Sequence, residues 1–161
     1  FEVMTACIMA HGGFIDKYIG DAIMAVFGAP VPHTSNEEIQ QDAIAAVKAS
    51  LGMYKALQTL NKEFAAAGLP TIRFGVGIHT GTVIGGTVGS RRRINYSLFG
   101  DAVNVAARLQ DVTKAGTVNA PYPILLSEAT YHHVSELYRG QAMGELMLRG
   151  RASSMPVYSI E

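Results

Sequence analysis

The chain has 161 residues, of which 48% are hydrophobic, and this suits one domain with a sizeable core. Lys and Arg together number 13, as do Asp and Glu, so a net charge of zero gives no electrostatic reason to expect a nucleic acid or an anionic membrane as partner. Cys7 is the single cysteine, which excludes an intrachain disulfide and fits a reducing compartment. No apolar run approaches the roughly 18 residues that cross a bilayer. We therefore expect a cytoplasmic chain without a membrane segment.

The first residues predict a helix. Phe1, Met4 and Ile8 recur at helical spacing, and Gly12 and Gly13 provide the stop. No capping or turn residue precedes Phe1, so we expect this chain to be part of a longer domain.

A β-hairpin is predicted next. Two apolar runs flank Gly20 and Asp21, and a Gly-Asp step between such runs is typical of a two-residue turn, because glycine accepts a positive φ. Asp16, Lys17 and Asp21 place charges around this turn. Such charges are ordinarily just solvated, so a functional role needs support from the rest of the chain.

A long helix follows a loop rich in Gly, Pro and Ser. Ser35 and Glu38 form an S-x-x-E capping box at its start, and the helix is expected to stop near Gly68. One stripe carries its apolar side chains: Ile39, Ala43, Val47, Leu51, Tyr54, Leu57, Leu60 and Phe64.

The remaining segments alternate between strand and helix patterns. Ile72, Phe74, Val76 and Ile78 alternate as in a strand, and Asp101 can cap a helix whose inner face includes Val103, Ala106 and Leu109. Further elements are predicted as strands at 94–98, 122–127, 144–148 and 157–160 and as a helix from Ser127 to about Leu137. This mixture predicts an α+β fold, with helices packed against a largely antiparallel sheet.

Common nucleotide and metal motifs do not account for the glycines and histidines. The glycine-rich stretch 75–89 lacks the lysine of a Walker loop, and Gly75 and Gly77 lie in a predicted strand instead of opening a helix. His132 and His133 are adjacent on a helix, so they cannot form an i,i+4 metal pair. Turns and close backbone packing explain the glycines better.

Asn104 and Arg108 are stronger candidates for a site. Their i,i+4 spacing places them on one face of a helix that begins directly after a strand and a Gly-Asp turn. Taken alone, a solvated polar stripe is the ordinary interpretation. The position at a helix start and the several donors of arginine favour a phosphate-binding role.

Three segments together resemble the class III nucleotide cyclase catalytic domain, the family of adenylate and guanylate cyclases. They are GGFIDKYIGDAIMAVFG, FGVGIHTGTVIGGTVG and NYSLFGDAVNVAARL, with a weaker fourth in GELMLRGRASSMPVYSIE. Their joint order and spacing cover nearly the whole chain, so the resemblance implies that residues 1–161 form one catalytic domain of this family, without the strand that carries its first metal aspartate. The resemblance implies a ferredoxin-like βαββαβ core sheet within the α+β class.

The resemblance also implies roles for individual residues. Asp21 matches a metal ligand, and Lys17 and Ser97 match the two positions that contact the adenine base. Guanylate cyclases usually carry Glu at the first of these positions and Cys at the second. Asn104 resembles the asparagine that orients the ribose, and Arg108 the arginine that stabilises the transition state.

The implied reaction converts ATP into 3′,5′-cyclic AMP and pyrophosphate, with two Mg²⁺ or Mn²⁺ ions per active site. The implied assembly is a head-to-tail homodimer with shared sites, in which Asp21 comes from one chain and the base, ribose and phosphate contacts come from the other. Two departures stand out. The family's first metal aspartate lies upstream of the opening helix, so we expect the chain to be inactive by itself. Arg149 replaces the family's triphosphate-binding lysine and keeps its positive charge.

Two other functions compete with an adenylate cyclase. A guanylate cyclase is favoured by the similarity of YSLFGD to the guanylate-type YCLFGD, and Lys17 argues against it. A non-catalytic nucleotide-binding or dimerisation module is opposed by the presence of Asp21, Asn104 and Arg108.

Overall fold

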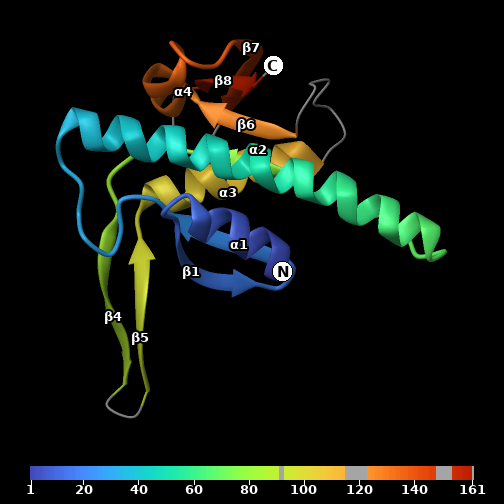
Figure 1. Ribbon diagram of the computed structural model, residues 1–161. Helices are drawn as coiled ribbons and strands as arrows, with labels where there is room; N and C mark the ends of the chain where they lie inside the picture. Colours follow the sequence, from blue (N-terminus) through green and yellow to red (C-terminus); the bar gives the residue numbers. More distant parts are fainter. Residues whose placement is uncertain (91–92, 115–122, 148–153, 161) are drawn as a thin grey trace.

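The computed structural model describes residues 1–90, 93–114, 123–147 and 154–160 (Figure 1). Helices and strands alternate along the chain, as the sequence predicts. In order they are α1 (Glu2–Ala10), β1 (Phe14–Ile19), β2 (Ala22–Val26), α2 (Asn36–Ala66), β3 (Val76–Ile78), β4 (Ile84–Ser90), β5 (Arg93–Phe99), α3 (Asp101–Lys114), β6 (Ile124–Ser127), α4 (Glu128–Val134), β7 (Gly140–Met147) and β8 (Ser154–Ile160).

The strands form a four-stranded sheet and two ribbons. The sheet has the order β3-β6-β8-β7, in which β3 pairs parallel with β6 and the other pairs are antiparallel. The ribbons are the antiparallel pairs β1–β2 and β4–β5, and the second extends as an arm away from the helices (Figure 1). The predicted α+β class with a largely antiparallel sheet is confirmed.

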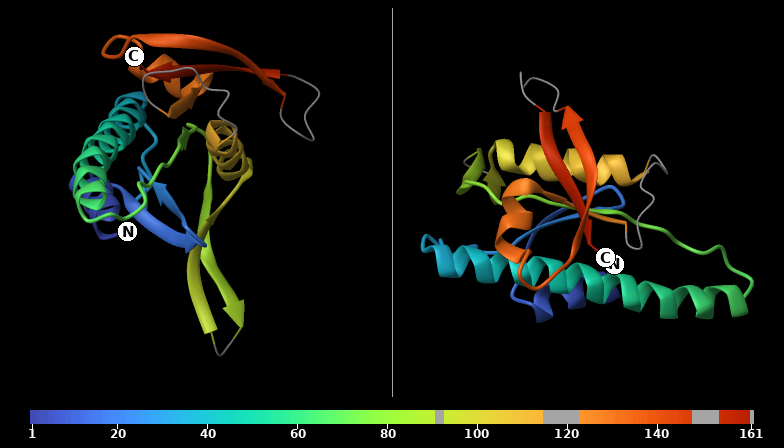
Figure 2. Two further views of the ribbon diagram at one scale, coloured as in Figure 1. Left: turned by 90° about the vertical axis from the view of Figure 1, so that its right-hand side faces the viewer. Right: turned by 90° about the horizontal axis from the view of Figure 1, so that it is seen from above.

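Helices cover both faces of β6. Ile124 and Leu126 belong to a buried cluster that includes Val47 of α2, whereas Leu125 packs with Leu109 of α3. Because successive side chains of a strand point to opposite faces, α2 and α3 lie on opposite sides of the sheet. The left view of Figure 2 shows the two helices well apart. The strand is therefore fixed from both sides, and the packing of Leu109 against it holds α3, the helix that carries Asn104 and Arg108.

The predicted helix and hairpin at the start of the chain are confirmed. The backbone N–H of Gly13 donates to the carbonyl of Ile8 at 3.0 Å, which closes the end of α1. Pairing of Ile19 with Ala22 leaves a two-residue loop. Gly20 has φ +61° there, as the first position of a type II′ turn requires.

The capping box of α2 is also confirmed. The Ser35 hydroxyl accepts the backbone N–H of Glu38 at 3.2 Å, and the Glu38 carboxylate accepts the backbone N–H of Ser35 at 3.1 Å. Although α2 spans 31 residues, no helix of the described residues is apolar and long enough to cross a membrane.

One predicted strand is much shorter than expected. Only 76–78 pairs in a ladder, and 72–75 has no regular structure. The Asn61 side chain satisfies the backbone of Ile72 instead, with its amide donating to the carbonyl and its oxygen accepting the N–H, both at 2.8 Å. The alternation of apolar residues could not show that a side chain takes the place of a neighbouring strand.

Two helix predictions need smaller corrections. The fully buried side of α3 carries Ala102, Val105 and Leu109, whereas Val103 and Ala106 are half-buried, so the inward face is rotated by about one residue from the expected one. Helix α4 ends at Val134 instead of near Leu137.

Replacing the capping serine, Ser35→Ala, should lower the free energy of unfolding by about 1 kcal/mol, because the N–H of Glu38 loses its acceptor. The hydrogen bond from the Ser35 backbone, followed by that from its hydroxyl, lowers the pKa of the Glu38 carboxyl. Its stabilising contribution is therefore present above the unfolded-state pKa and is lost as the pH falls through the lower folded-state value. Urea unfolding at pH 7 and pH 3 measures both effects. An equal loss at both pH values would contradict the coupling.

Candidate active site

The structure brings β1 and β5 together through four polar groups. The Asp16 carboxylate accepts the Ser97 hydroxyl at 3.2 Å through one oxygen and the Leu98 backbone N–H at 3.2 Å through the other. Lys17 Nζ lies 3.1 Å from the same carboxylate and donates to Ser97 Oγ. We call Asp16, Lys17 and Ser97 the β1–β5 cluster. Two residues that the sequence analysis assigned to one base-binding role, 80 positions apart, are thus in direct contact.

A bulge in β1 allows this contact. Ile15 pairs with Ala25 and Lys17 pairs with Met24, so Asp16 has no residue opposite it on β2. In a regular strand, Asp16 and Lys17 would point to opposite faces. A bulge re-aims side chains locally, and here both reach the Ser97 hydroxyl.

The exposure of the cluster is uneven. The Asp16 side chain is fully buried and Ser97 is 6% exposed, whereas 40% of the Lys17 side chain reaches the surface. Lys17 Nζ also lies 5.6 Å from the centre of the Phe99 ring, within cation–π range. The ammonium is thus held by a carboxylate and a hydroxyl, while part of the Lys17 side chain remains exposed to solvent.

Asp21 lies at the exposed turn of the β1–β2 hairpin. Within the described part of the chain its carboxylate has no hydrogen bond or ion pair, and no group of three or more His, Cys, Asp or Glu side chains could hold a metal there. Mg²⁺ is commonly held by one or two carboxylates together with substrate phosphates and water. A free carboxylate at a turn fits one such ligand and does not form a complete metal site by itself.

Helix α3 starts one residue after β5 and presents the next two candidates. Gly100 joins the elements with φ +146°, a conformation that favours glycine. Asn104 is exposed and Arg108 is half-buried, and both lie away from the buried side that carries Val105 and Leu109. One turn of helix separates them by about 6 Å along the axis.

The predicted site residues therefore fall into three groups. Lys17 and Ser97 touch each other, Asn104 and Arg108 share a face of α3, and Asp21 stands alone at the hairpin turn. No hydrogen bond or ion pair among the described residues joins these groups. Arg149, the remaining predicted site residue, lies outside the described residues.

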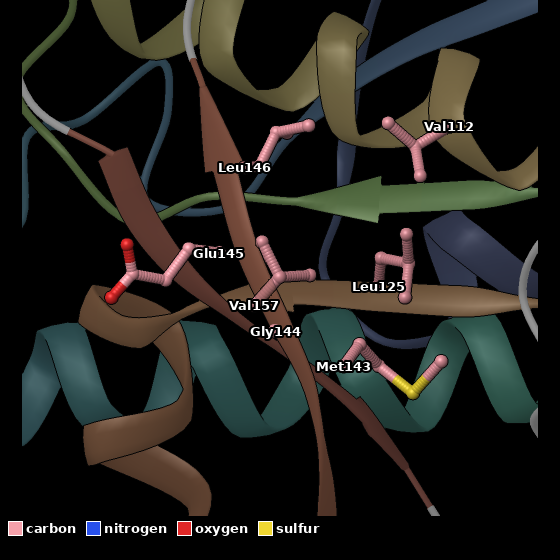
Figure 3. Close-up of a pocket in the computed structure, with 7 residues that line it drawn as sticks. All are labelled: Val112, Leu125, Met143, Gly144, Glu145, Leu146 and Val157. Atoms are coloured by element: carbon pink, nitrogen blue, oxygen red, sulfur yellow. The ribbon is translucent and has the colours of Figure 1, made fainter.

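A pocket beside α3 is separate from the described candidate residues (Figure 3). Its lining is apolar apart from Glu145 and comes from α3, β6, β7 and β8: Val112, Leu125, Met143, Gly144, Glu145, Leu146 and Val157. Among the described residues, it shares none with the predicted site. Its described lining has one carboxylate and no cation, which is unsuited to a triphosphate, so we do not assign the nucleotide to it.

Sequence reasoning missed Asp16. The sequence alone presents it as one of several charges near the turn and assigns it no role. The available signal was an acidic side chain inside an apolar strand run, directly before Lys17. Burying such a carboxylate requires compensating hydrogen bonds and charge, which the neighbouring lysine and the partners on β5 supply.

Comparisons with known proteins match nearly the whole chain. The sequence model described as "Adenylate and Guanylate cyclase catalytic domain" matches residues 4–161. "Adenylate cyclase 1" of Rhizobium meliloti is 32% identical over 99% of this chain and 23% of its own length. The crystal structure of the adenylyl cyclase CyaB from P. aeruginosa matches with a TM-score of 0.84 at 28% identity, over 98% of this chain and 76% of that chain. That of the guanylyl cyclase Cya2 matches with a TM-score of 0.80 at 28% identity, over 99% and 75%.

The chain spans less than a third of the length of the first curated relatives that it matches. The matched range of the family model, residues 4–161, nevertheless contains the positions of all three groups of candidate residues. The chain belongs to the family of adenylate and guanylate cyclase catalytic domains.

Proposed function

We propose that this domain is an adenylate cyclase that converts ATP into 3′,5′-cyclic AMP and pyrophosphate. The observation that carries the choice of ATP is the contact of Lys17 with Ser97 across β1 and β5. An ammonium only donates hydrogen bonds, and a serine hydroxyl has lone pairs that accept them. Adenine offers the matching edge, with an acceptor at N1 and a donor at its 6-amino group. Guanine has a donor at N1 and an acceptor at O6.

The face of α3 supports the proposed chemistry at the sugar and phosphates. Asn104, one turn into the helix, is proposed to hydrogen-bond the ribose and hold its 3′-oxygen in line with the α-phosphorus. Arg108, one turn further, is proposed to neutralise the charge that grows on the α-phosphoryl oxygens. Such preorganised donors act without rearranging at the moment of reaction.

Asp21 is proposed to hold divalent metal, and Arg149 to bind the triphosphate. Two Mg²⁺ or Mn²⁺ ions, when bound, would make the ribose 3′-hydroxyl easier to ionise and would balance the charge of the departing pyrophosphate. The exposed carboxylate of Asp21 supports this role because nothing within the described residues competes for it.

We further propose that two copies form a head-to-tail homodimer with shared active sites. Large apolar side chains near the candidate residues remain on the surface, including Tyr18 at 55%, Ile19 at 58% and Phe99 at 43% exposure. A second chain could cover this surface. The arrangement assigns Asp21 of one chain to the site that contains Lys17 and Arg108 of the other.

The substrate is tested by product analysis with ATP and GTP side by side, using the full-length protein that carries this domain. Cyclic AMP should predominate. Lys17→Glu should lower the ratio of kcat/KM for ATP over GTP by about tenfold or more, since a carboxylate accepts where adenine N1 needs a donor. Lys48→Glu, at an exposed site on α2, is the matched control. If cyclic GMP predominates, the domain is a guanylate cyclase. If neither product forms, it is a non-catalytic module.

Arg108→Ala should lower kcat by about 10²-fold or more while KM changes little, because its contact strengthens only as charge develops on the phosphate. Arg73→Ala removes an exposed arginine from another segment and should leave both constants unchanged. Steady-state kinetics with ATP measures the split. A variant whose defect is mainly a raised KM would show that Arg108 binds the substrate without a special role in the transition state.

Mixing two inactive variants tests the shared site. In a head-to-tail dimer of Asp21→Ala with Arg108→Ala, one site collects both lesions and the other has both residues intact. Random pairing makes about half of the dimers mixed, each with one good site of two, so activity should return to about a quarter of wild type. Native mass spectrometry of differently tagged chains confirms that mixed dimers form. No recovery in their presence would contradict the shared site.

A further inference from the structure

The buried Asp16 carboxylate fixes which way the Ser97 hydroxyl points. That hydroxyl has one proton and two lone pairs. The ammonium of Lys17 can only donate and the carboxylate of Asp16 can only accept, and both contact Ser97 Oγ. The proton of Ser97 must therefore lie toward Asp16, and one lone pair toward Lys17.

The hydrogen-bonding role that Ser97 can take toward a ligand follows from these contacts of its proton and lone pairs. With its proton directed to Asp16, the hydroxyl has only a lone pair left for a third partner. An unrestrained serine could instead rotate and donate to a carbonyl oxygen. The exocyclic group that distinguishes the two purines is a donor in adenine and an acceptor in guanine. A serine locked as an acceptor favours the first and opposes the second.

Asp16 is itself held in place. Its second oxygen accepts the backbone N–H of Leu98 at 3.2 Å, its side chain is fully buried, and it occupies the bulge of β1. It also lies 3.1 Å from Lys17 Nζ, so the same carboxylate restrains both groups proposed to read the base. Because the Asp16 side chain is buried, it can act on a ligand only through Lys17 and Ser97.

We propose that Asp16 is a positioning residue for base selection, which makes Ser97 an obligate hydrogen-bond acceptor and so disfavours guanine. This inference rests on the proposed reading of adenine by Lys17 and Ser97. It assigns the discrimination between the nucleotides to three residues instead of two.

Asp16→Asn tests the inference with almost no change of shape. The amide oxygen can still accept the Leu98 N–H. The amide nitrogen replaces the oxygen that contacts Ser97 and Lys17, so it no longer accepts from Lys17, and it donates to Ser97 Oγ and frees the serine proton for guanine O6. The ratio of kcat/KM for ATP over GTP should fall by about tenfold or more. The ratio of the dissociation constant for GTP over that for ATP, measured calorimetrically in EDTA so that no turnover occurs, should also fall.

Two further variants isolate the route through Ser97. In a Ser97→Ala background, Asp16→Asn should change the ratio much less, because the hydroxyl whose direction it sets is gone. Asp42→Asn is the matched control. Asp42 lies on α2, outside the β1–β5 cluster, and its carboxylate is paired with His33 at 2.7 Å. That control should leave the nucleotide ratio unchanged. If Asp16→Asn does not fold, Asp16→Ala replaces it, because it removes the acceptor and should shift the ratio the same way.

The outcomes separate this inference from the proposed function. A wild-type protein without preference for ATP would overturn the proposed substrate. A preference for ATP that survives Asp16→Asn or Asp16→Ala would overturn the role of Asp16 alone. An equal fall in the ratio with and without the Ser97 hydroxyl would also overturn it, because Asp16 would then act by another route.

Discussion

The candidate site depends on burying one carboxylate between two ribbons of the fold. Asp16 joins β1 to β5 through the Ser97 hydroxyl and the Leu98 backbone, and it partly balances the charge of Lys17. A carboxylate removed from water is costly unless hydrogen bonds and charge compensate it, and here the hydrogen bonds from β5 and the charge of Lys17 offset that cost. The bulge at Asp16 makes this possible, because it directs two consecutive side chains toward one hydroxyl.

From this junction the chain runs directly into the proposed phosphate side of the site. Phe99 ends β5 beneath the Lys17 ammonium, Gly100 turns the backbone, and α3 begins at the next residue. Burial of Leu109 against β6 fixes the rotation of α3 and leaves Arg108 toward the accessible side. The core therefore determines which polar face the helix presents, and a few residues of continuous backbone set the distance between the proposed base and phosphate contacts.

Local signals in the sequence were sufficient for much of this. The stop after α1, the Gly-Asp turn and the capping box each depend on neighbouring residues, and the structure has all three. Neighbouring residues could not show what depends on distant partners. The segment 72–75 is not a strand because Asn61 occupies the backbone of Ile72, and the hydrogen bonds of Asp16 come from residues more than 80 positions away. The family resemblance identified Lys17 and Ser97, but only the folded chain shows what holds them.

Lys17 and Arg108, two cations of the proposed site, differ in how much of their charge is available to a ligand. Asp16 lies against Lys17, so this ammonium contributes little net attraction for a triphosphate and acts mainly through the direction of its hydrogen bonds. Arg108 has no ion-pair partner among the described residues, and its charge is available to a ligand. Direction is what distinguishes one base from another, whereas charge is what a phosphate requires. In the proposed site, the paired Lys17 would therefore select the base, and Arg108 of α3, which has no ion-pair partner among the described residues, would bind the phosphates.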